Sequence, residues 1–134
     1  MQNPNGIIVH SAAVGDYAPK EQGGKITSGQ ESLSMTLFPT IKILDQIKTW
    51  SPESLVVSFK AAAPNTSPTE LTNIAQGQRT RSGSDLVFAN VLTQTGQNVQ
   101  LISNTSVTRI TERKDGIDAL ISWIQKNRLP IRAQ

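Results

Sequence analysis

Polar side chains follow three apolar runs of the sequence, at the points where buried strands are expected to end. The positions are Asp16 with Tyr17, Lys60 and Asn90. In an α/β sheet of parallel strands, ligands bind beyond the carboxyl ends of the strands. A carboxylate, an amine and an amide gathered there could bind a polar ligand. Their spacing alone indicates a site and does not say which chemistry it performs.

The composition excludes several kinds of chemistry at such a site. The 134 residues contain no cysteine and one histidine, His10, which leaves no thiolate nucleophile, no disulfide framework and no histidine pair for zinc. The sequence has no glycine-rich phosphate loop of the dinucleotide or Walker type and no Gly-x-Ser-x-Gly turn. We expect no metal ligand set within the chain, and we interpret His10 as structural.

Length and hydropathy predict one soluble domain over residues 1–134. No run approaches the roughly 20 apolar residues that a membrane span needs. The polar start of the chain lacks a signal-type apolar segment. We therefore expect a cytoplasmic protein without membrane contact.

The formal net charge of +3 arises in residues 109–134, because residues 1–108 hold seven Lys/Arg and seven Asp/Glu. Aromatic residues make up 4% of the chain, too few to stack bases along a basic groove. We interpret the basic excess as a solvated helix face and expect no nucleic-acid partner. Nucleic-acid binding through this tail would require an affinity that falls steeply with salt.

Apolar runs and helical patterns alternate along the chain, which is typical of an α/β sheet with mostly parallel strands. Residues 6–14, 55–59 and 85–90 predict strands buried on both faces of the sheet. Residues 32–37 alternate polar and apolar side chains, which predicts a half-exposed strand. Residues 15–30, with few apolar side chains and two adjacent glycines, predict a mobile loop.

The remaining patterns predict three helices and a β pair. Residues 40–50 carry an apolar helical stripe, and Ser67 opens a capping box with Glu70 for a helix that closes near Gly83. Residues 98–103 are expected to pair with residues 106–110 as two β-strands. The last helix is expected to bury Ile117, Leu120, Ile121 and Ile124 in the core. We therefore expect a partial Rossmann-like sheet flanked by helices.

Six short blocks occur in a distinctive order over nearly the whole chain. They are Ala12-Ala-Val-Gly-Asp-Tyr17, Lys25-Ile-Thr-Ser28, Leu33-x-Met-x-Leu37, Pro39-x-Ile-Lys-Ile-Leu44, Val56-Val-Ser-Phe-Lys60 and Asp85-Leu-Val-x-Ala-Asn90. In this order and spacing the chain resembles the phosphopantothenate-cysteine ligase family, also called phosphopantothenoylcysteine synthetase. Each block alone is a weak signal, and the specificity lies in their combination.

The resemblance implies a reaction of coenzyme A biosynthesis. The family activates the carboxylate of 4'-phosphopantothenate with CTP or ATP, and cysteine attacks the resulting acyl-nucleotide to form an amide. Such chemistry needs Mg2+ and cationic groups on the phosphates, together with a lid that keeps water from the acyl intermediate. The family's active form is a dimer, so we expect self-association.

The resemblance also implies roles for individual residues. Lys25 matches a flexible-loop lysine that takes part in the acyl-nucleotide step. The nucleotide-binding positions are matched by Asp16, Lys25, Pro39, Thr40, Ile41, Lys42 and Phe59, and the substrate-binding positions by Ala12, Ala13 and Asn90. Four of these residues have a plainer interpretation from the sequence alone: Asp16 as a turn residue, Lys25 as a solvated lysine, Phe59 as a core aromatic and Asn90 as a cap of its strand end.

The chain departs from the family pattern at the phosphates. The second lysine of a Lys-Ile-Lys motif is Thr27 here. Two family lysines that contact the triphosphate align with Gln78 and Ser82, while Arg79 and Arg81 lie beside them and are expected to bind the nucleotide instead. Arginine binds phosphate with a different geometry from lysine.

The family's amino-terminal half, with its Asn-x-Ser-Ser-Gly segment, has no counterpart in this sequence. Two interpretations stay open. In the first, the chain is the carboxyl-terminal half of a ligase, whose catalysis needs an amino-terminal half. In the second, it is a non-catalytic nucleotide-binding or regulatory module that binds another protein.

Overall fold

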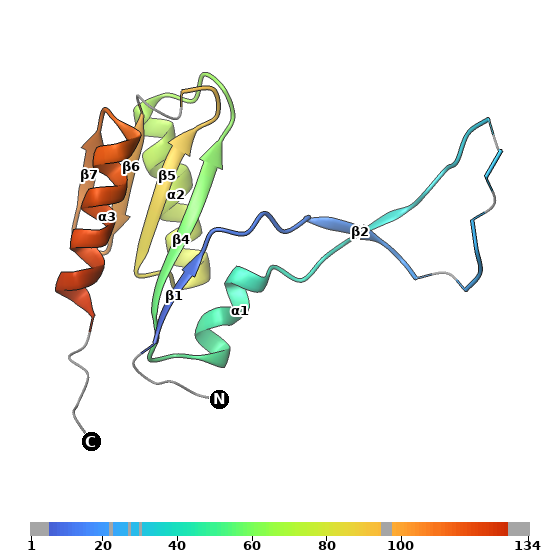
Figure 1. The fold of residues 1–134 in the computed structure, drawn as a ribbon, viewed down its shortest axis with the longest axis horizontal. Coiled ribbons are helices and arrows are strands. Elements are labelled where there is room, and N and C mark those ends of the chain that lie inside the picture. Colours follow the sequence, from blue (N-terminus) through green and yellow to red (C-terminus); the bar gives the residue numbers. More distant parts are fainter. Residues whose placement is uncertain (1–5, 22, 27, 30, 95–97, 129–134) are drawn as a thin grey trace. The chain divides into compact units, whose positions relative to one another are not determined.

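The computed structural model describes residues 6–21, 23–26, 28–29, 31–94 and 98–128. The chain forms two compact units (Figure 1). The first, here called the sheet unit, comprises Met1–Ser11 and Leu44–Gln134. The second, here called the ribbon unit, comprises Ala12–Ile43. Each unit is described by itself.

The sheet unit is built on a five-stranded sheet of order β1-β4-β5-β6-β7. Its strands are β1 (Ile7–His10), β4 (Leu55–Ala62), β5 (Leu86–Val91), β6 (Val99–Ser103) and β7 (Val107–Ile110). β1, β4 and β5 are parallel, and β6 runs antiparallel to both of its neighbours. Four of these five strands therefore point the same way. The expected mostly parallel sheet, and the β pair that extends it, are confirmed.

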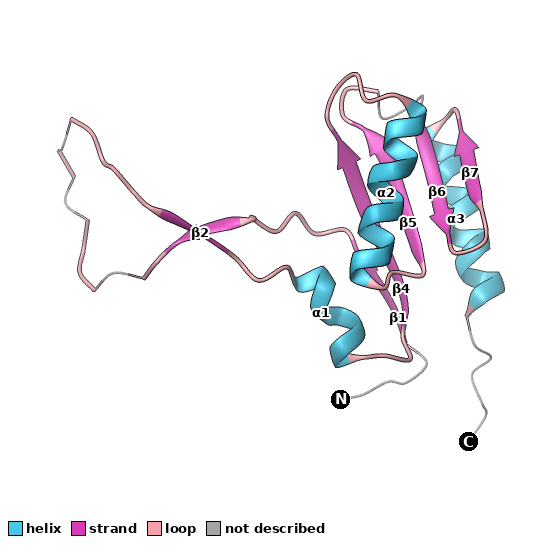
Figure 2. Ribbon diagram, turned by 180° about the vertical axis from the view of Figure 1, so that it is seen from behind, coloured by secondary structure: helices cyan, strands magenta, loops and turns pink. Residues whose placement is uncertain are grey.

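Two helices cover opposite faces of this sheet. Figure 1 shows α3 (Arg113–Asn127) in front of the strands, and Figure 2 shows α2 (Pro68–Ser82) on the other face. Side chains of β5 alternate between the two cores, because successive residues of a strand point to opposite faces. Leu86 and Phe88 join the cluster on the α3 face, whereas Val87 and Ala89 join the cluster on the α2 face.

The capping box of α2 is confirmed. The Ser67 hydroxyl accepts a hydrogen bond from the Glu70 amide, the Glu70 carboxylate accepts one from the Ser67 amide, and Pro68 begins the helix. The Ser67 amide and, at 2.8 Å, the Ser67 hydroxyl donate hydrogen bonds to the Glu70 carboxylate, which lower the pKa of Glu70 because they stabilise its charged form. Gly83 ends the helix with a left-handed φ of 69°.

Two predictions about burial in the sheet unit are wrong. The strand expected over residues 6–14 is β1, which ends at His10 and lies at the sheet edge, so Val9 is 49% exposed. Ile121 of α3 is 48% exposed, while Leu120 is buried and Ile117 and Ile124 are partly buried. Both errors arise because an apolar side chain is buried only where another element covers it.

The ribbon unit contains an antiparallel pair, β2 (Tyr17–Pro19) with β3 (Leu37–Pro39). The prediction of a strand over residues 32–37 is wrong, since regular pairing begins only at Leu37, opposite Pro19. β2 also lies inside the segment expected to be a loop. Its three residues have no apolar pattern that predicts a strand, and they become a strand by pairing with β3.

Helix α1 (Ile43–Trp50) follows the ribbon and begins three residues later than expected. Ile47 is its buried side chain. No helix among the residues that the structure describes is long and apolar enough to cross a membrane.

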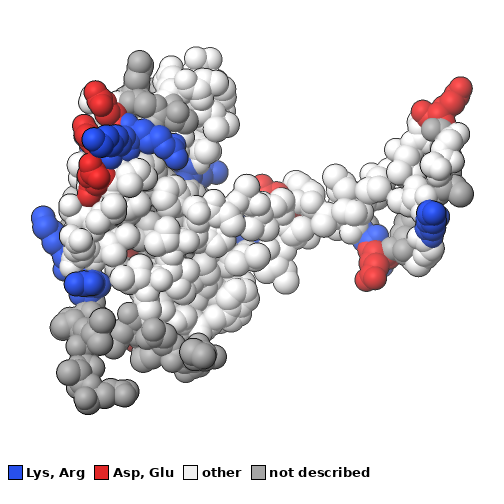
Figure 3. Space-filling model, viewed as in Figure 1, with Lys and Arg blue, Asp and Glu red and all other residues white. Residues whose placement is uncertain are grey.

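Charged side chains of both signs lie side by side over the start of α3 (Figure 3). The first two turns of this helix carry Arg113 and Lys114 together with Asp115 and Asp118. This mixture supports the interpretation of the basic excess as a solvated face.

Candidate functional site

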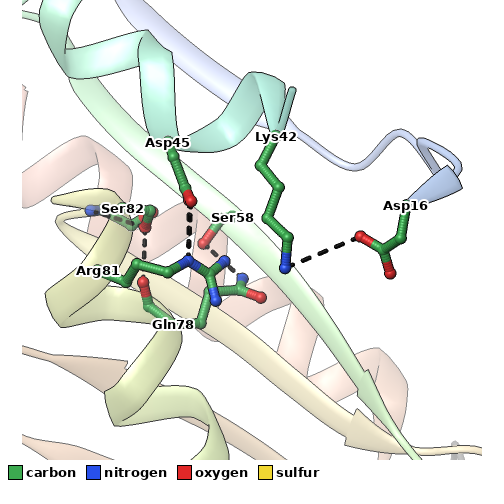
Figure 4. A network of polar contacts seen from close by, with 8 residues as sticks. Asp16, Lys42, Asp45, Ser58, Gln78, Arg81 and Ser82 are labelled. Carbon is green, nitrogen blue, oxygen red and sulfur yellow. Dashed lines mark hydrogen bonds and ion pairs between the residues drawn. The ribbon is translucent and has the colours of Figure 1, made fainter. Parts of the chain in front are cut away.

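Four residues of the ribbon unit form the best-connected part of the expected site, here called the junction. The amide of Thr40 donates a 2.9 Å hydrogen bond to the main-chain oxygen of Asp16, and the Thr40 hydroxyl donates to the oxygen of Gly15. The Nζ of Lys42 lies 3.8 Å from Oδ1 of Asp16 (Figure 4). Segments far apart in sequence are thus joined where β2 begins and β3 ends.

The charges of the junction face solvent. The side chains of Lys42 and Asp16 are 51% and 69% exposed. An exposed ion pair of this kind contributes only about 0–1 kcal/mol to stability. Both groups can therefore exchange their partner for a ligand at little energetic cost.

The expected neighbours of the junction lie in the same unit. Pro39 pairs with Tyr17 in the ribbon, and Ile41 is exposed between Thr40 and Lys42. Ala12 and Ala13 are exposed in the extended segment before Gly15.

Lys25 lies in the ribbon unit between β2 and β3, on the wall of an open groove of about 820 Å³. Gly23 and Gly24 line the same groove, as do Leu33 and Met35 from the returning segment. Gly24 has a φ of 120°, which glycine adopts without strain. Thr27, the departure from the Lys-Ile-Lys pattern, lies outside the described residues.

The other expected site residues, Phe59, Arg79, Arg81 and Asn90, lie in the sheet unit. Phe59 stacks on Phe88 with ring centroids 5.0 Å apart and packs against the core cluster on the α3 face. Asn90 is buried at the end of β5, on the same face as Phe88. Phe59, inside β4, is thus packed against the core, and Asn90, next to the last residue of β5, is buried.

Gln78 and Ser82, which align with family lysines, point toward the sheet and their own helix. The Gln78 side chain donates hydrogen bonds of 3.1 Å to the Ser58 hydroxyl and to the main-chain oxygen of Phe59. The Ser82 hydroxyl donates to the oxygen of Gln78 at 2.8 Å (Figure 4). Both side chains are buried. Neither presents a polar group to a ligand outside the core.

Arg79 and Arg81 lie on opposite flanks of α2. Residues two positions apart in an α-helix lie about 200° apart around its axis. Arg81 binds Asp45 of α1 (Figure 4). Arg79 follows Thr72 by two helical turns, and Thr72 binds Gln100 of β6. The structure therefore does not bring the two arginines together.

Sequence reasoning missed the polar groups that hold α1 on the sheet unit. Lys48 of α1 donates a 2.7 Å hydrogen bond to the oxygen of Ser54, and its Nζ lies 2.8 Å from Oδ2 of Asp85. The same carboxylate oxygen accepts a hydrogen bond from the amide of Val56. The available signal was an acidic residue, Asp85, at the start of a predicted buried strand, because buried main-chain groups need hydrogen-bond partners.

No group of three or more His, Cys, Asp or Glu side chains in the described part of the chain could hold a metal ion by itself. Mg2+ in nucleotide sites is commonly bound by one or two carboxylates together with the substrate phosphates. The carboxylate of Asp16 is exposed, as a ligand of such a metal ion must be.

The fold and the junction define an α/β domain with a ribbon inserted between its first two parallel strands. A family model described as DNA/pantothenate metabolism flavoprotein C-terminal domain matches residues 2–129. The chain belongs to this family. The resemblance of the sequence to the ligase domain is thereby confirmed.

The chain is also similar to a curated protein and to solved structures. The coenzyme A biosynthesis bifunctional protein CoaBC of Thermococcus kodakarensis is 44% identical over 87 residues, which are 64% of this chain and 21% of that protein. The crystal structure of the DNA/pantothenate metabolism flavoprotein from Streptococcus pneumoniae matches with a TM-score of 0.76 at 24% identity, covering 90% of this chain and 62% of that one.

A structure of the C-terminal domain of CoaBC matches with a TM-score of 0.60 at 18% identity, covering 90% of this chain and 54% of that one. The two structural matches show a shared fold. The chain spans about a fifth of the length of the curated relative and three fifths of the Streptococcus pneumoniae chain.

Proposed function

We propose that this chain binds CTP or ATP and takes part in the ligation of cysteine to 4'-phosphopantothenate, in the cytoplasm. The observation that carries the proposal is the junction, where Asp16, Thr40 and Lys42 are held together within a chain of the CoaBC C-terminal family. A cation and a carboxylate, both exposed, are the groups needed to bind the phosphates of a nucleotide and its Mg2+.

The proposed reaction has two steps. The carboxylate of 4'-phosphopantothenate attacks the α-phosphorus of the nucleotide, which releases pyrophosphate and gives an acyl-nucleotide. The amine of cysteine then attacks the acyl carbon, forming the amide and releasing the nucleoside monophosphate. When bound, Mg2+ would neutralise charge on the phosphates.

Lysines supply the cations in this proposal. Lys42 binds the phosphates from the junction, where its present partner is a single exposed carboxylate. Lys25 acts on the acyl-nucleotide from the glycine-containing segment between β2 and β3. A loop of this kind can close over a ligand and exclude water from a reactive ester.

The remaining residues position the substrates. Pro39 and Ile41 line the nucleotide beside Thr40, and Ala12 and Ala13 let the main chain approach the substrate. Phe59 lies beside the base, and Asn90 binds 4'-phosphopantothenate through its amide.

We propose that the active form is a homodimer or an assembly with an amino-terminal half. Large apolar side chains that are exposed in the ribbon unit support a partner, because exposed apolar residues that form a contiguous patch commonly mark an interface. They are Tyr17, Ile26, Leu33, Met35, Leu37 and Phe38. In the sheet unit, β1 also pairs with a single described strand, which leaves one edge for another chain.

The test measures nucleotide binding and ligation separately. Calorimetric titration of the chain with CTP and with ATP, each with Mg2+, is expected to show one preferred nucleotide. Amide formation, followed by mass spectrometry, is expected when a separately produced amino-terminal half of a family member is added. Binding without ligation in the completed mixture would favour the non-catalytic module, and no binding of either nucleotide would contradict both functions.

A further inference from the structure

We propose that Thr40 is a positioning residue, which holds Lys42 in place for the phosphates and does not itself bind them. This inference rests on the proposed nucleotide-binding function and deepens it at the junction. It separates Thr40 from the residues that contact the nucleotide. Gly15, Asp16, Thr40 and Lys42 all lie in the ribbon unit.

Both hydrogen-bond donors of Thr40 are already used within the chain. Its amide donates a 2.9 Å hydrogen bond to the main-chain oxygen of Asp16, and its hydroxyl donates to the main-chain oxygen of Gly15. A hydroxyl has one proton to donate and a main-chain amide has one, whereas ionised phosphate oxygens only accept hydrogen bonds. Thr40 therefore has no donor left for a phosphate unless one of these two hydrogen bonds breaks.

The hydrogen bonds of Thr40 hold the main chain just before Lys42. Because β3 ends at Pro39, Thr40 ties the chain beyond the ribbon pairing to the opposite segment. Lys42 follows two residues later, so its Cα lies within about 7 Å of the Cα of Thr40. A lysine side chain is long and flexible, so the place of its main chain limits which groups its Nζ can reach.

The ion pair of Lys42 with Asp16 cannot fix this arrangement by itself. Its Nζ and Oδ1 atoms are 3.8 Å apart, and both side chains are more than half exposed, so the attraction is weak (Figure 4). A phosphate that binds Lys42 replaces Asp16 as its partner. The hydrogen bonds of Thr40 go to main-chain oxygens and need not change in that exchange. Holding the main chain of the lysine reduces the entropy lost when the phosphate binds.

The experiment measures nucleotide affinity in a double-mutant cycle of Thr40→Val and Lys42→Gln. Valine keeps the β-branched shape and the main-chain amide of threonine, and it removes the hydroxyl. Thr40→Ser keeps the hydroxyl. Thr108→Val is the matched control, because it makes the same change at an exposed position of β7 in the sheet unit. Each affinity is measured by calorimetry with Mg2+ and whichever of CTP and ATP the unaltered chain prefers.

We expect Thr40→Val to lower nucleotide affinity about fivefold, because losing one of its two hydrogen bonds loosens the main chain before Lys42. In the Lys42→Gln chain the same substitution should lower affinity less than about twofold, because Thr40 acts through Lys42. Thr40→Ser keeps the hydrogen bond to Gly15, so it and Thr108→Val should each stay within about twofold of the unaltered chain.

Three results would overturn the inference while leaving nucleotide binding intact. The first is an equal loss from Thr40→Val with and without Lys42, which would mean that Thr40 contacts the nucleotide or supports the ribbon in general. The second is a Thr40→Val chain that keeps the affinity of the unaltered chain. The third is a Thr40→Ser chain that binds as weakly as Thr40→Val. An unaltered chain that binds neither nucleotide would overturn the proposed function, and the inference with it.

Discussion

The side-chain amide of Gln78 donates a 3.1 Å hydrogen bond to the main-chain oxygen of Phe59, one residue beyond the last pair of β4 with β1. The same amide donates to the hydroxyl of Ser58, which pairs with His10. Helix α2 thus supplies a hydrogen-bond donor to β4 at the point where its neighbouring strand ends. A buried carbonyl left without a partner is costly.

Replacing Gln78 with leucine is expected to destabilise the sheet unit by about 1–3 kcal/mol, because the buried Ser58 hydroxyl and Phe59 oxygen lose their donor. Chemical denaturation gives the free energy of unfolding. Gln76→Leu, at an exposed position of the same helix, is the control and should change it by less than about 0.5 kcal/mol. Equal effects of the two substitutions would mean that the hydrogen bonds of Gln78 do not contribute to the free energy of unfolding.

Gly116 of α3 is expected not to tolerate alanine. An added Cβ would lie 3.0 Å from Cγ1 of Val99 and 3.3 Å from the ring of Phe88, both in the core. Overpacking of this kind costs about 1–3 kcal/mol. Gly77→Ala in α2 is the matched control: its Cβ would meet nothing within 4 Å, so it should stabilise the protein by about 0.5–1 kcal/mol. A stabilising Gly116→Ala would show that α3 can move away from the sheet.

The capping box of α2 makes part of the stability depend on pH. Hydrogen bonds to Ser67 lower the pKa of Glu70 in the folded chain from its ordinary value of 4.5. A lowered folded pKa means that this contribution is complete above the unfolded pKa and is lost as the pH falls through the folded one. Glu70→Gln should therefore be less stable than the unaltered chain at pH 7, with a smaller difference at pH 3. Thermal unfolding at both pH values tests this, and a difference that does not shrink in acid would contradict it.

Lys25→Gln is expected to reduce amide formation far more than nucleotide binding, because the lysine is proposed to act on the acyl-nucleotide. Single-turnover assays in the completed ligase mixture give the first quantity and calorimetry the second. Lys20→Gln, which removes a charge from the wall of the same groove, is the control. Equal losses in ligation and binding would count against a role for Lys25 in the chemical steps.

Local signals in the sequence predicted the parts of the fold that depend on neighbouring residues. The capping box needs only Ser67 and Glu70, three positions apart, and β5 is a short apolar run buried on both faces. β1 has a similar apolar run, yet it lies at an edge. The difference between the two strands lies in what flanks them in space, which their own residues do not encode.

The sequence indicated which residues of the candidate site to consider, but only in part which of them lie together. Family blocks indicated Asp16, Thr40 and Lys42, and the structure brings these three together. The partner of Arg81 could not be read from the sequence, because Asp45 is 36 residues away in a different helix. Whether Gln78 points to ligand or core likewise depends on Ser58, in a strand that precedes α2.

The junction between Gly15, Asp16 and Thr40 also bears on how the chain folds. β1 pairs with β4, far along the sequence, and the whole ribbon unit lies in the connection between them. If the ribbon closes on itself first, the chain that must still be ordered to pair these strands becomes shorter. Loop-closure entropy rises with the logarithm of loop length, by about 0.6 kcal/mol per doubling. The hydrogen bonds of the junction thus lower the effective contact order of the sheet. Their loss should slow refolding more than it speeds unfolding.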